Sequence, residues 1–259
     1  MPATNAILEV DELTKSFGGV TAVKDATLSV ARRTITGLIG PNGAGKTTLF
    51  NLITGFLTPT SGTIRFQGER IDGLPPHRIF RKGIVRTFQI PHELKTMTVL
   101  ENLMLVPTNQ AGEQIWNPWL FGFRVAREER RHYDKAMEVL EFVDLAPLRD
   151  EYAANLSGGQ KKLLELARTL MADPTMILLD EPGAGVNRVL MQKLVGQIEV
   201  LCHDLGITIF IIEHDMDLVT RLCNPVIVMS EGRKLAEGTP DEVKADERVL
   251  EAYLGGQYR

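Results

Sequence analysis

The sequence predicts an α/β fold with a sheet that is parallel at its centre. Two short apolar runs, Met176–Leu179 and Ile207–Ile212, have the length of buried strands, and segments with helical periodicity lie before and after them. A third apolar stretch, Thr34–Ile39, leads into a glycine-rich loop and a helix that we expect from about Lys46 to Phe56. Because buried strands that alternate with helices build parallel sheets, these segments predict the α/β core.

The N-terminal residues have a different pattern. Short strands are expected at Ile7–Val10 and Lys15–Phe17, on either side of a polar turn, and at Ala26–Val30. The close turns between them indicate an antiparallel sheet, because parallel strands need long connections. A hairpin is expected where Thr63–Phe66 runs into Gln67 and Gly68. The core therefore carries an N-terminal antiparallel β subdomain.

The middle of the chain is helical. Residues 98–148 follow a helical pattern that is interrupted at Pro107 and Pro118. This stretch separates two parts with the α/β pattern, so we interpret it as an inserted α-helical subdomain. We expect a single domain over residues 1–259, with the core and β subdomain over about 1–95 and 155–259 and the insert over about 96–154.

Composition and charge exclude several classes of protein. Of the 259 residues, 44% are hydrophobic and 24% are charged, which is typical of a globular domain. The formal net charge of -4 argues against a nucleic-acid partner, which would select a basic surface. No apolar run approaches the roughly 20 residues of a membrane span, and the first residues lack a signal-peptide pattern, so we expect a cytoplasmic chain. Cys202 and Cys223 are expected to be structural thiols rather than a redox pair.

Residues 40–47 match the phosphate-binding pattern G-x-x-x-x-G-K-[ST] at each fixed position. Glycines let the backbone curl so that its N–H groups face an anion, and the helix N-terminus adds positive potential there. Lys46 is expected to reach the outer phosphates, and the Thr47 hydroxyl to bind Mg²⁺. The alternative is an ordinary glycine-rich turn. The residues expected to contact the nucleotide here are Asn42, Gly43, Ala44, Gly45, Lys46, Thr47 and Thr48.

Two carboxylates follow the apolar run Met176–Leu179. Asp180 and Glu181 come at the carboxyl end of this strand, which is the edge where ligands bind in open α/β sheets. Asp180 is placed to hold Mg²⁺ and its water shell, and Glu181 to orient or deprotonate an attacking water. Such a pair can also be merely solvated, but next to a phosphate loop we favour the catalytic interpretation.

A third motif identifies a family. Ser157 is expected to cap a helix that begins with Gly158, Gly159 and Gln160, and such a start can bind an anion or serve only as a cap. It lies about twenty residues before the acidic strand, in a chain with a phosphate loop. In this combination it resembles the signature of the ATP-binding-cassette (ABC) family, and the likeness covers nearly the whole chain. The resemblance implies a P-loop NTPase (RecA-like) core that binds ATP and Mg²⁺.

The resemblance also implies roles for three further residues. Gln89, within Arg86-Thr87-Phe88-Gln89, corresponds to the family's glutamine that contacts Mg²⁺ and couples to a membrane partner. His214 corresponds to the switch histidine near the terminal phosphate, and Phe17 to the aromatic ring that stacks on adenine; each could instead be structural. Asn187 stands where the family usually has an aspartate, which puts the usual contact of this loop across a dimer in doubt.

The family resemblance further implies partners. Residues 157–160 would complete the nucleotide site of a second ABC ATPase subunit, identical or different, so that two ATP molecules lie between two cassettes. A separate transmembrane permease would hold the chain on the inner face of the cell membrane, and a substrate-binding protein would act indirectly. Residues 81–89, 97–103 and 253–255 are similar to the ATP-binding subunits of branched-chain amino acid importers.

Other functions remain open from the sequence. The same motifs occur in the ATPase of an exporter of lipid or lipopolysaccharide, and in soluble ABC ATPases without a transport role. A phosphoryl-transfer kinase with the same loop is disfavoured by the motif at Ser157. The apolar stretch from Trp116 to Phe123 is interpreted as local helix contacts, with a partner or membrane-surface contact as the alternative.

Overall fold

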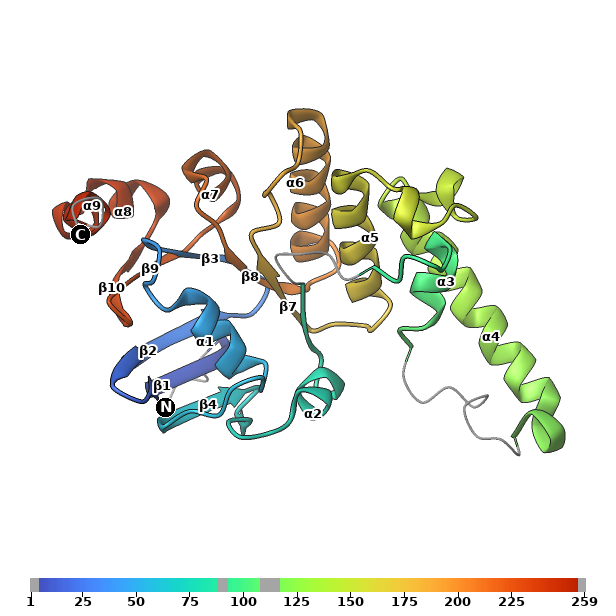
Figure 1. The fold of residues 1–259 in the computed structure, drawn as a ribbon, viewed down its shortest axis with the longest axis horizontal. Helices are drawn as coiled ribbons and strands as arrows, with labels where there is room; N and C mark the ends of the chain where they lie inside the picture. Colours follow the sequence, from blue (N-terminus) through green and yellow to red (C-terminus); the bar gives the residue numbers. More distant parts are fainter. Residues whose placement is uncertain (1–4, 88–92, 108–116, 256–259) are drawn as a thin grey trace. The chain divides into compact units, whose positions relative to one another are not determined.

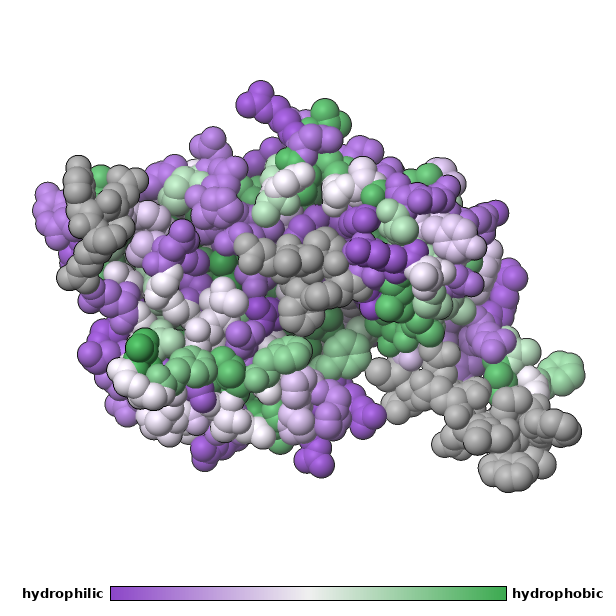
Figure 2. Space-filling model, in the orientation of Figure 1, coloured by the Kyte–Doolittle hydropathy of each residue, from purple (hydrophilic) through white to green (hydrophobic). Residues whose placement is uncertain are grey.

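The computed structural model describes residues 5–87, 93–107 and 117–255, and the side chains of 117–121 and 255 are outside the description. The chain divides into two units. The first comprises Met1–Arg86, Thr175–Ala184 and Ile198–Arg259, and the second comprises Thr87–Pro174 and Gly185–Gln197. In the described part of the chain, no helix has both the length and the apolar character of a membrane span. The face in Figure 2 is largely hydrophilic, with hydrophobic side chains in small groups.

An antiparallel sheet opens the first unit (Figure 1), as predicted. Its order is β2-β1-β4-β5, with bounds β1 Ala6–Phe17, β2 Val20–Ala31, β4 Ser61–Phe66 and β5 Glu69–Arg70. The prediction of two strands around a polar turn was wrong, because β1 continues through this stretch. Glu12 takes a positive φ of 46°. At this residue the register of β1 shifts in its pairing with β2 and also in its pairing with β4. The polar residues thus form an irregularity inside one strand.

A six-stranded sheet forms the rest of the first unit. Its order is β10-β9-β3-β8-β7-β6, with bounds β3 Ile35–Ile39, β6 Ile84–Arg86, β7 Met176–Asp180, β8 Thr208–Ile212, β9 Val226–Ser230 and β10 Arg233–Gly238. All neighbours pair in parallel except β10, which is antiparallel to β9. The predicted parallel centre is confirmed. Strands β3, β7 and β8 are buried throughout, which explains their continuous apolar runs.

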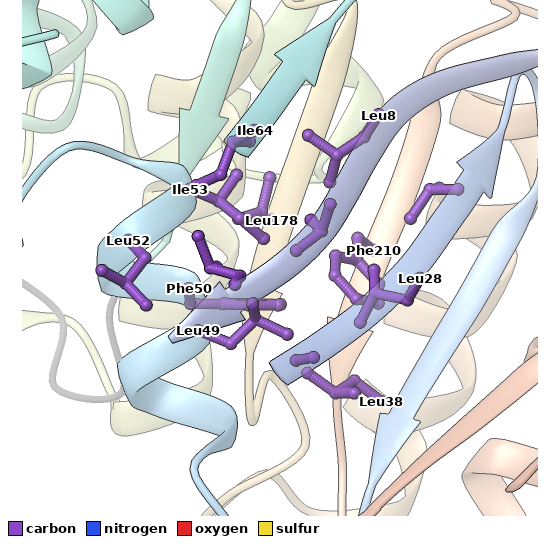
Figure 3. Close-up of a cluster of buried hydrophobic side chains, with 14 of the residues drawn as sticks. Leu8, Leu28, Leu38, Leu49, Phe50, Leu52, Ile53, Ile64, Leu178 and Phe210 are labelled. Carbon is purple, nitrogen blue, oxygen red and sulfur yellow. The ribbon is translucent and has the colours of Figure 1, made fainter. Parts of the chain in front are cut away.

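Helix α1, Lys46–Ile53, lies between the two sheets and supplies the centre of the core (Figure 3). Its side chains Phe50 and Ile53 are fully buried, and the Phe50 ring lies 5.1 Å from that of Phe210 on β8. The helix ends at Ile53, three residues before the predicted end, because Gly55 with a φ of 75° follows its C-cap Thr54. This core holds α1 in place through the buried face of the helix.

The second unit is helical in its first part. It contains α3 Val99–Met104, α4 Asn117–Phe142, the short 3₁₀ turns η2 Ala146–Leu148 and η3 Ala153–Asn155, and α5 Gly158–Leu170. Pro107 follows the end of α3 as predicted. Pro118 lies in the first turn of α4, where proline needs no hydrogen-bond partner, so it accompanies the start of a helix. Phe123 on α4 is 97% exposed, whereas Trp116 lies outside the described residues.

The other helices lie between the strands of the first unit, at its C-terminal end and across the boundary of the two units. Their bounds are α2 Pro76–Arg81, α6 Arg188–His203, α7 Met216–Leu222, α8 Pro240–Ala245 and α9 Glu247–Gly255. Helix α6 begins in the second unit and continues into the first. Cys202 and Cys223 are free and buried, in agreement with the prediction of structural thiols.

Candidate active site

The glycine-rich loop joins β3 to α1 through a left-handed turn. Gly45 has a φ of 97° and serves as the N-cap of α1. A Cβ on Gly45 would lie 2.4 Å from the carbonyl oxygen of Ala22, so both the backbone conformation and the space require glycine here. The first turn of α1 therefore begins directly at the loop, and its N–H groups face the loop interior.

The ammonium group of Lys46 lies inside this loop. Its Nζ donates hydrogen bonds to the carbonyl oxygens of Gly40 at 2.7 Å and Pro41 at 3.0 Å. Burial lowers the pKa of Lys46, and the nearby carboxylates of Glu181 and Asp180 oppose this shift. The structure thus brings Lys46 together with both acidic residues that the sequence singled out.

The other loop residues differ in exposure. Asn42, Gly43 and Thr47 are exposed, and Thr48 is half-buried, so their polar groups are accessible to a ligand. Ala44 is buried; its N–H donates to Pro41 at 3.2 Å, and its carbonyl oxygen accepts from Gly232 at 3.1 Å. Ala44 therefore anchors the loop to the β9–β10 turn.

Asp180 ends β7 and is 4% exposed. Its Oδ2 accepts a hydrogen bond from Nη2 of Arg86 at 2.7 Å, within a buried ion pair. Nη1 of the same guanidinium donates to Oδ1 of Asn51 on α1 at 2.6 Å. Arg86 therefore joins the acidic end of β7 to the helix that follows the phosphate loop.

Glu181 and His214 follow neighbouring strands and approach each other. Glu181 comes directly after β7 with a φ of 48°, and its N–H donates to the carbonyl of Ile212 at 3.0 Å. Its Oε1 lies 3.8 Å from Nδ1 of His214, whose side chain is 66% exposed. A carboxylate and an accessible imidazole thus lie side by side, close to Lys46 and Asp180.

Phe17 and Gln89 are two further residues that the sequence predicts to contact the nucleotide. The ring of Phe17 at the end of β1 is 47% exposed, and Nζ of Lys15 lies 5.1 Å from its centroid. Phe17 is therefore no core residue, and its face is accessible to a planar ligand. Gln89 lies outside the described residues.

The second unit carries the motif at 157–160. Ser157 caps α5, as predicted: its Oγ accepts from the Gln160 N–H at 3.3 Å, and its N–H donates to Gln160 Oε1 at 2.8 Å. Ser157 and Gly158 are exposed, and a Cβ on Gly158 would meet open space. A Cβ on Gly159 would lie 2.0 Å from Cδ2 of Leu190, so this glycine lets α5 approach α6.

Asn187 caps the other helix of this pair. Its Oδ1 accepts from the Leu190 N–H at 3.0 Å, and its carbonyl oxygen accepts from Met191 at 2.9 Å. The asparagine therefore performs the capping role that an aspartate would have at this position, without the negative charge.

Oxygen donors suited to Mg²⁺ are present at the phosphate loop. Within the described ranges, no three or more His, Cys, Asp or Glu side chains gather around one point. Mg²⁺ bound with a nucleotide needs only one or two protein oxygens, because phosphates and waters supply the rest. The Thr47 hydroxyl and the Asp180 carboxylate are donors of this kind, so the residues present fit such an ion.

Sequence reasoning gave no role to Arg86, Asn51 or Glu213. Glu213, the residue after β8, is 2% exposed and accepts a hydrogen bond from the Gly183 N–H at 2.9 Å. The available signals were weak: Arg86 and Glu213 are charged residues at the ends of apolar strands, and Glu213 is next to His214, which was already singled out. Partners such as Asn51 are distant in sequence and come together only in the folded chain.

Comparison with known proteins agrees with this geometry. The family model described as ABC transporter matches residues 23–184, and the model described as branched-chain amino acid ATP-binding cassette transporter matches residues 233–259. A probable branched-chain amino acid transport ATP-binding protein LivG of Archaeoglobus fulgidus is 43% identical over 97% of this chain and 96% of its own length. The high-affinity branched-chain amino acid transport ATP-binding protein BraF of Pseudomonas aeruginosa is 41% identical over 96% of this chain and 98% of its own length.

Solved structures show the same likeness. A nucleotide-free ATP-binding cassette from an ABC transporter superposes with a TM-score of 0.83 at 40% identity, covering 95% of this chain and 98% of that chain. The ADP conformation of an ABC transporter cassette gives a TM-score of 0.82 at 39% identity, over 96% and 99% of the two chains. The family match, the full-length relatives and the phosphate-loop geometry agree: this chain belongs to the ABC transporter family, as one of its ATP-hydrolysing cassettes.

Proposed function

We propose that this chain is the ATP-hydrolysing subunit of an importer for branched-chain or related amino acids. The observation that carries the ATPase role is the convergence of Lys46, Asp180, Glu181 and His214 at the end of the parallel sheet. The amino-acid cargo is supported by the names of the LivG and BraF relatives and by the match over residues 233–259.

The proposed chemistry assigns a role to each residue of the site. The N–H groups of residues 42–48 bind the phosphates, and Lys46 neutralises charge on the outer ones. Glu181 takes a proton from the attacking water or orients it, and His214 contacts the terminal phosphate. Phe17 stacks on the adenine ring. Thr47, Asp180 and Gln89 would hold Mg²⁺, which when bound neutralises charge on the phosphate oxygens.

We further propose that the complete site forms between two subunits. The exposed N-terminus of α5, with Ser157, Gly158, Gly159 and Gln160, would contact the nucleotide held by a second cassette, identical or different. Hydrolysis removes the terminal phosphate that both subunits bind, so the pair opens and can move a partner. In this proposal the chain is a single ABC ATPase domain, with an inserted helical subdomain over about 96–154.

The proposed partner is a transmembrane permease, which holds the chain at the inner face of the cell membrane. Leu94 and Leu105, on either side of α3, are 41% and 55% exposed, and Figure 2 shows hydrophobic side chains on the surface of this region. The buried amide of Asn102 bonds both the N–H and the carbonyl of Leu94, which fixes this surface segment. A substrate-binding protein would deliver the cargo to the permease, not to this chain.

The two-subunit site is tested with Glu181→Gln. This change removes the base but keeps ATP bound, so light scattering with ATP is expected to show a dimer, whereas the wild-type chain returns to monomer as it hydrolyses ATP. Adding Lys46→Ala to the same variant is the control, because loss of nucleotide binding abolishes the dimer. A Glu181→Gln chain that stays monomeric with saturating ATP would contradict the two-subunit site.

The direction and cargo of transport need a cellular test. Deletion of the gene is expected to abolish high-affinity uptake of labelled leucine, isoleucine and valine, and the wild-type gene is expected to restore it. A gene carrying Glu181→Gln is the matched control that restores protein but not uptake. Unchanged uptake in the deletion strain, with a defect in lipid or lipopolysaccharide export, would favour the exporter ATPase instead.

A further inference from the structure

Glu213 is a buried acidic residue for which the proposed mechanism has no role. It lies between Ile212, the last residue of β8, and His214, and its side chain is 1% exposed. Glutamate is almost never fully buried unless its carboxyl group has partners, because the charged form loses its hydration. The partners of this carboxyl group therefore indicate what it does.

The partners of Glu213 are backbone groups of the two loops that carry the reactive side chains. Oε1 accepts from the Gly183 N–H at 2.9 Å, and Oε2 accepts from the His214 N–H at 3.2 Å. Oε2 also lies 3.9 Å from Nδ1 of His214. Burial raises the pKa of Glu213, and the N–H groups of Gly183, His214 and Asp215 oppose this shift. The side chain thus contacts the loop after β7 and the loop after β8 at once.

The loop after β7 is attached at two points, to the last residue of β8 and to the residue that follows it. The first is the hydrogen bond from the Glu181 N–H to the Ile212 carbonyl at 3.0 Å, and the second is the Gly183–Glu213 bond two residues further on. Glu181, the residue at the first attachment, has a φ of 48°, a conformation that costs energy for an L-residue and is held by its surroundings. Loss of the second attachment would remove a hydrogen bond that holds this turn beside the end of β8.

We propose that Glu213 is a positioning residue for ATP hydrolysis: its buried carboxyl group joins the loop of Glu181 to the loop of His214 and sets the separation of these two side chains. The inference rests on the proposed function, because it takes Glu181 and His214 as the groups that act on the water and the terminal phosphate. Their present separation is 3.8 Å between Oε1 and Nδ1, and a displacement of about 1 Å at reacting groups costs on the order of 100-fold in rate.

Two substitutions at position 213 test the hydrogen bond between the Gly183 N–H and the Glu213 carboxyl group. Glutamine has the length of glutamate and keeps one oxygen that accepts the Gly183 N–H, while its NH₂ group replaces the oxygen that accepts from His214; alanine has no acceptor at all. Glu213→Ala should therefore release the loop, and Glu213→Gln should retain it. Thr208→Val is the matched control. Thr208 is a buried residue at the start of β8, the strand that Glu213 follows, and its Oγ1 accepts from the Arg33 N–H at 3.0 Å, away from both loops.

The experiment measures kcat, KM and ATP affinity for the full chain, in the assembly that gives wild-type activity. Glu213→Ala is expected to lower kcat by about 10- to 100-fold, with the ATP dissociation constant within about twofold of wild type because the phosphate loop is untouched. Glu213→Gln is expected to keep kcat within about threefold. Hydrogen exchange at the Gly183 amide should accelerate in Glu213→Ala, and should stay slow in Glu213→Gln and Thr208→Val.

The outcomes separate the two proposals. A wild-type chain without ATPase activity overturns the proposed function itself. An active wild type with an unchanged kcat in Glu213→Ala overturns only the role of Glu213, and so does a Thr208→Val control that loses as much activity. Equal losses of kcat in Glu213→Ala and Glu213→Gln, with Gly183 exchange still slow in Glu213→Gln, overturn the role of the Gly183 bond, because the glutamine retains that bond.

Discussion

Nη2 of Arg86 lies 2.7 Å from Oδ2 of Asp180, and the two side chains are only 5% and 6% exposed. The guanidinium also donates to Asn51 on α1 and lies 5.6 Å from the ring centroid of Phe50. One cation thus connects β6, β7 and α1. The carboxylate proposed to hold Mg²⁺ is therefore oriented by an arginine whose role the sequence motif did not reveal.

Arg86→Met is expected to lower the free energy of unfolding by about 3–5 kcal/mol, because it leaves the Asp180 charge buried without its cation. Denaturant unfolding of the isolated chain measures the change. Arg233→Ala is the control: it removes an exposed pair with Asp25, whose side chains are 49% and 58% exposed, and should cost less than about 1 kcal/mol. Similar losses in both variants would show that burial does not strengthen the Arg86 pair.

Gly45→Ala is expected to reduce ATP affinity by at least about tenfold, or about 1.4 kcal/mol. The added Cβ would lie 2.4 Å from the Ala22 carbonyl, so the phosphate loop must shift. Gly73→Ala is the control, because Gly73 also has a positive φ, of 78°, but a Cβ there meets nothing within 4 Å. Titration with a fluorescent ATP analogue measures both; equal affinities would contradict the steric argument.

Asn187→Ala is expected to destabilise the chain by about 1 kcal/mol, because the Leu190 N–H loses its cap. Asn187→Asp keeps the acceptor and adds a negative charge at a helix N-terminus, so its stability should equal or exceed that of the wild type. Thermal unfolding followed by circular dichroism compares the three chains. A stable Asn187→Ala variant would mean that water replaces the cap without cost.

Both thiols are expected to resist alkylation in the folded chain. Burial raises the pKa of Cys223 to about 12, an effect to which the Glu213 carboxylate adds, and burial also raises the pKa of Cys202. At pH 8.5 an ordinary thiol is about half ionised, whereas one with a pKa near 12 is almost wholly protonated. Iodoacetamide should therefore label both only in denaturant, as mass spectrometry can show. Rapid labelling of the native chain would contradict their burial.

The same shift predicts an effect of pH on stability. The folded-state pKa of Cys223 is raised to about 12, above its value of about 8.5 in the unfolded chain. Its contribution to stability is therefore fully present below about pH 8.5 and is lost as the pH rises toward 12. Cys223→Ala should flatten this alkaline decline in the free energy of unfolding, measured by denaturant titration across that range. An identical decline in the variant would assign it to other groups.

Local signals in the sequence were sufficient for much of the fold and for the positions of the motifs. The apolar runs at β3, β7 and β8 predicted buried parallel strands, because their residues face helices or sheet on both sides. The capping pattern at Ser157 predicted the start of α5, since the bonds involved span only three residues. The end of helix α1 and the continuity of strand β1 were not predicted. Each depends on the backbone conformation of one residue with a positive φ, Gly55 just after α1 and Glu12 within β1.

The sequence by itself determined which residues this chain offers for chemistry: a phosphate loop ending in Lys46 and Thr47, an acidic pair at the end of β7 and a histidine shortly after β8. Only the tertiary structure decided how these groups are held in place. Arg86 meets Asp180 across 94 positions of sequence, and Gly183 meets Glu213 across 30. Such contacts have no local signal, because they depend on strand order and register in the sheet, which place residues distant in the chain within hydrogen-bond distance.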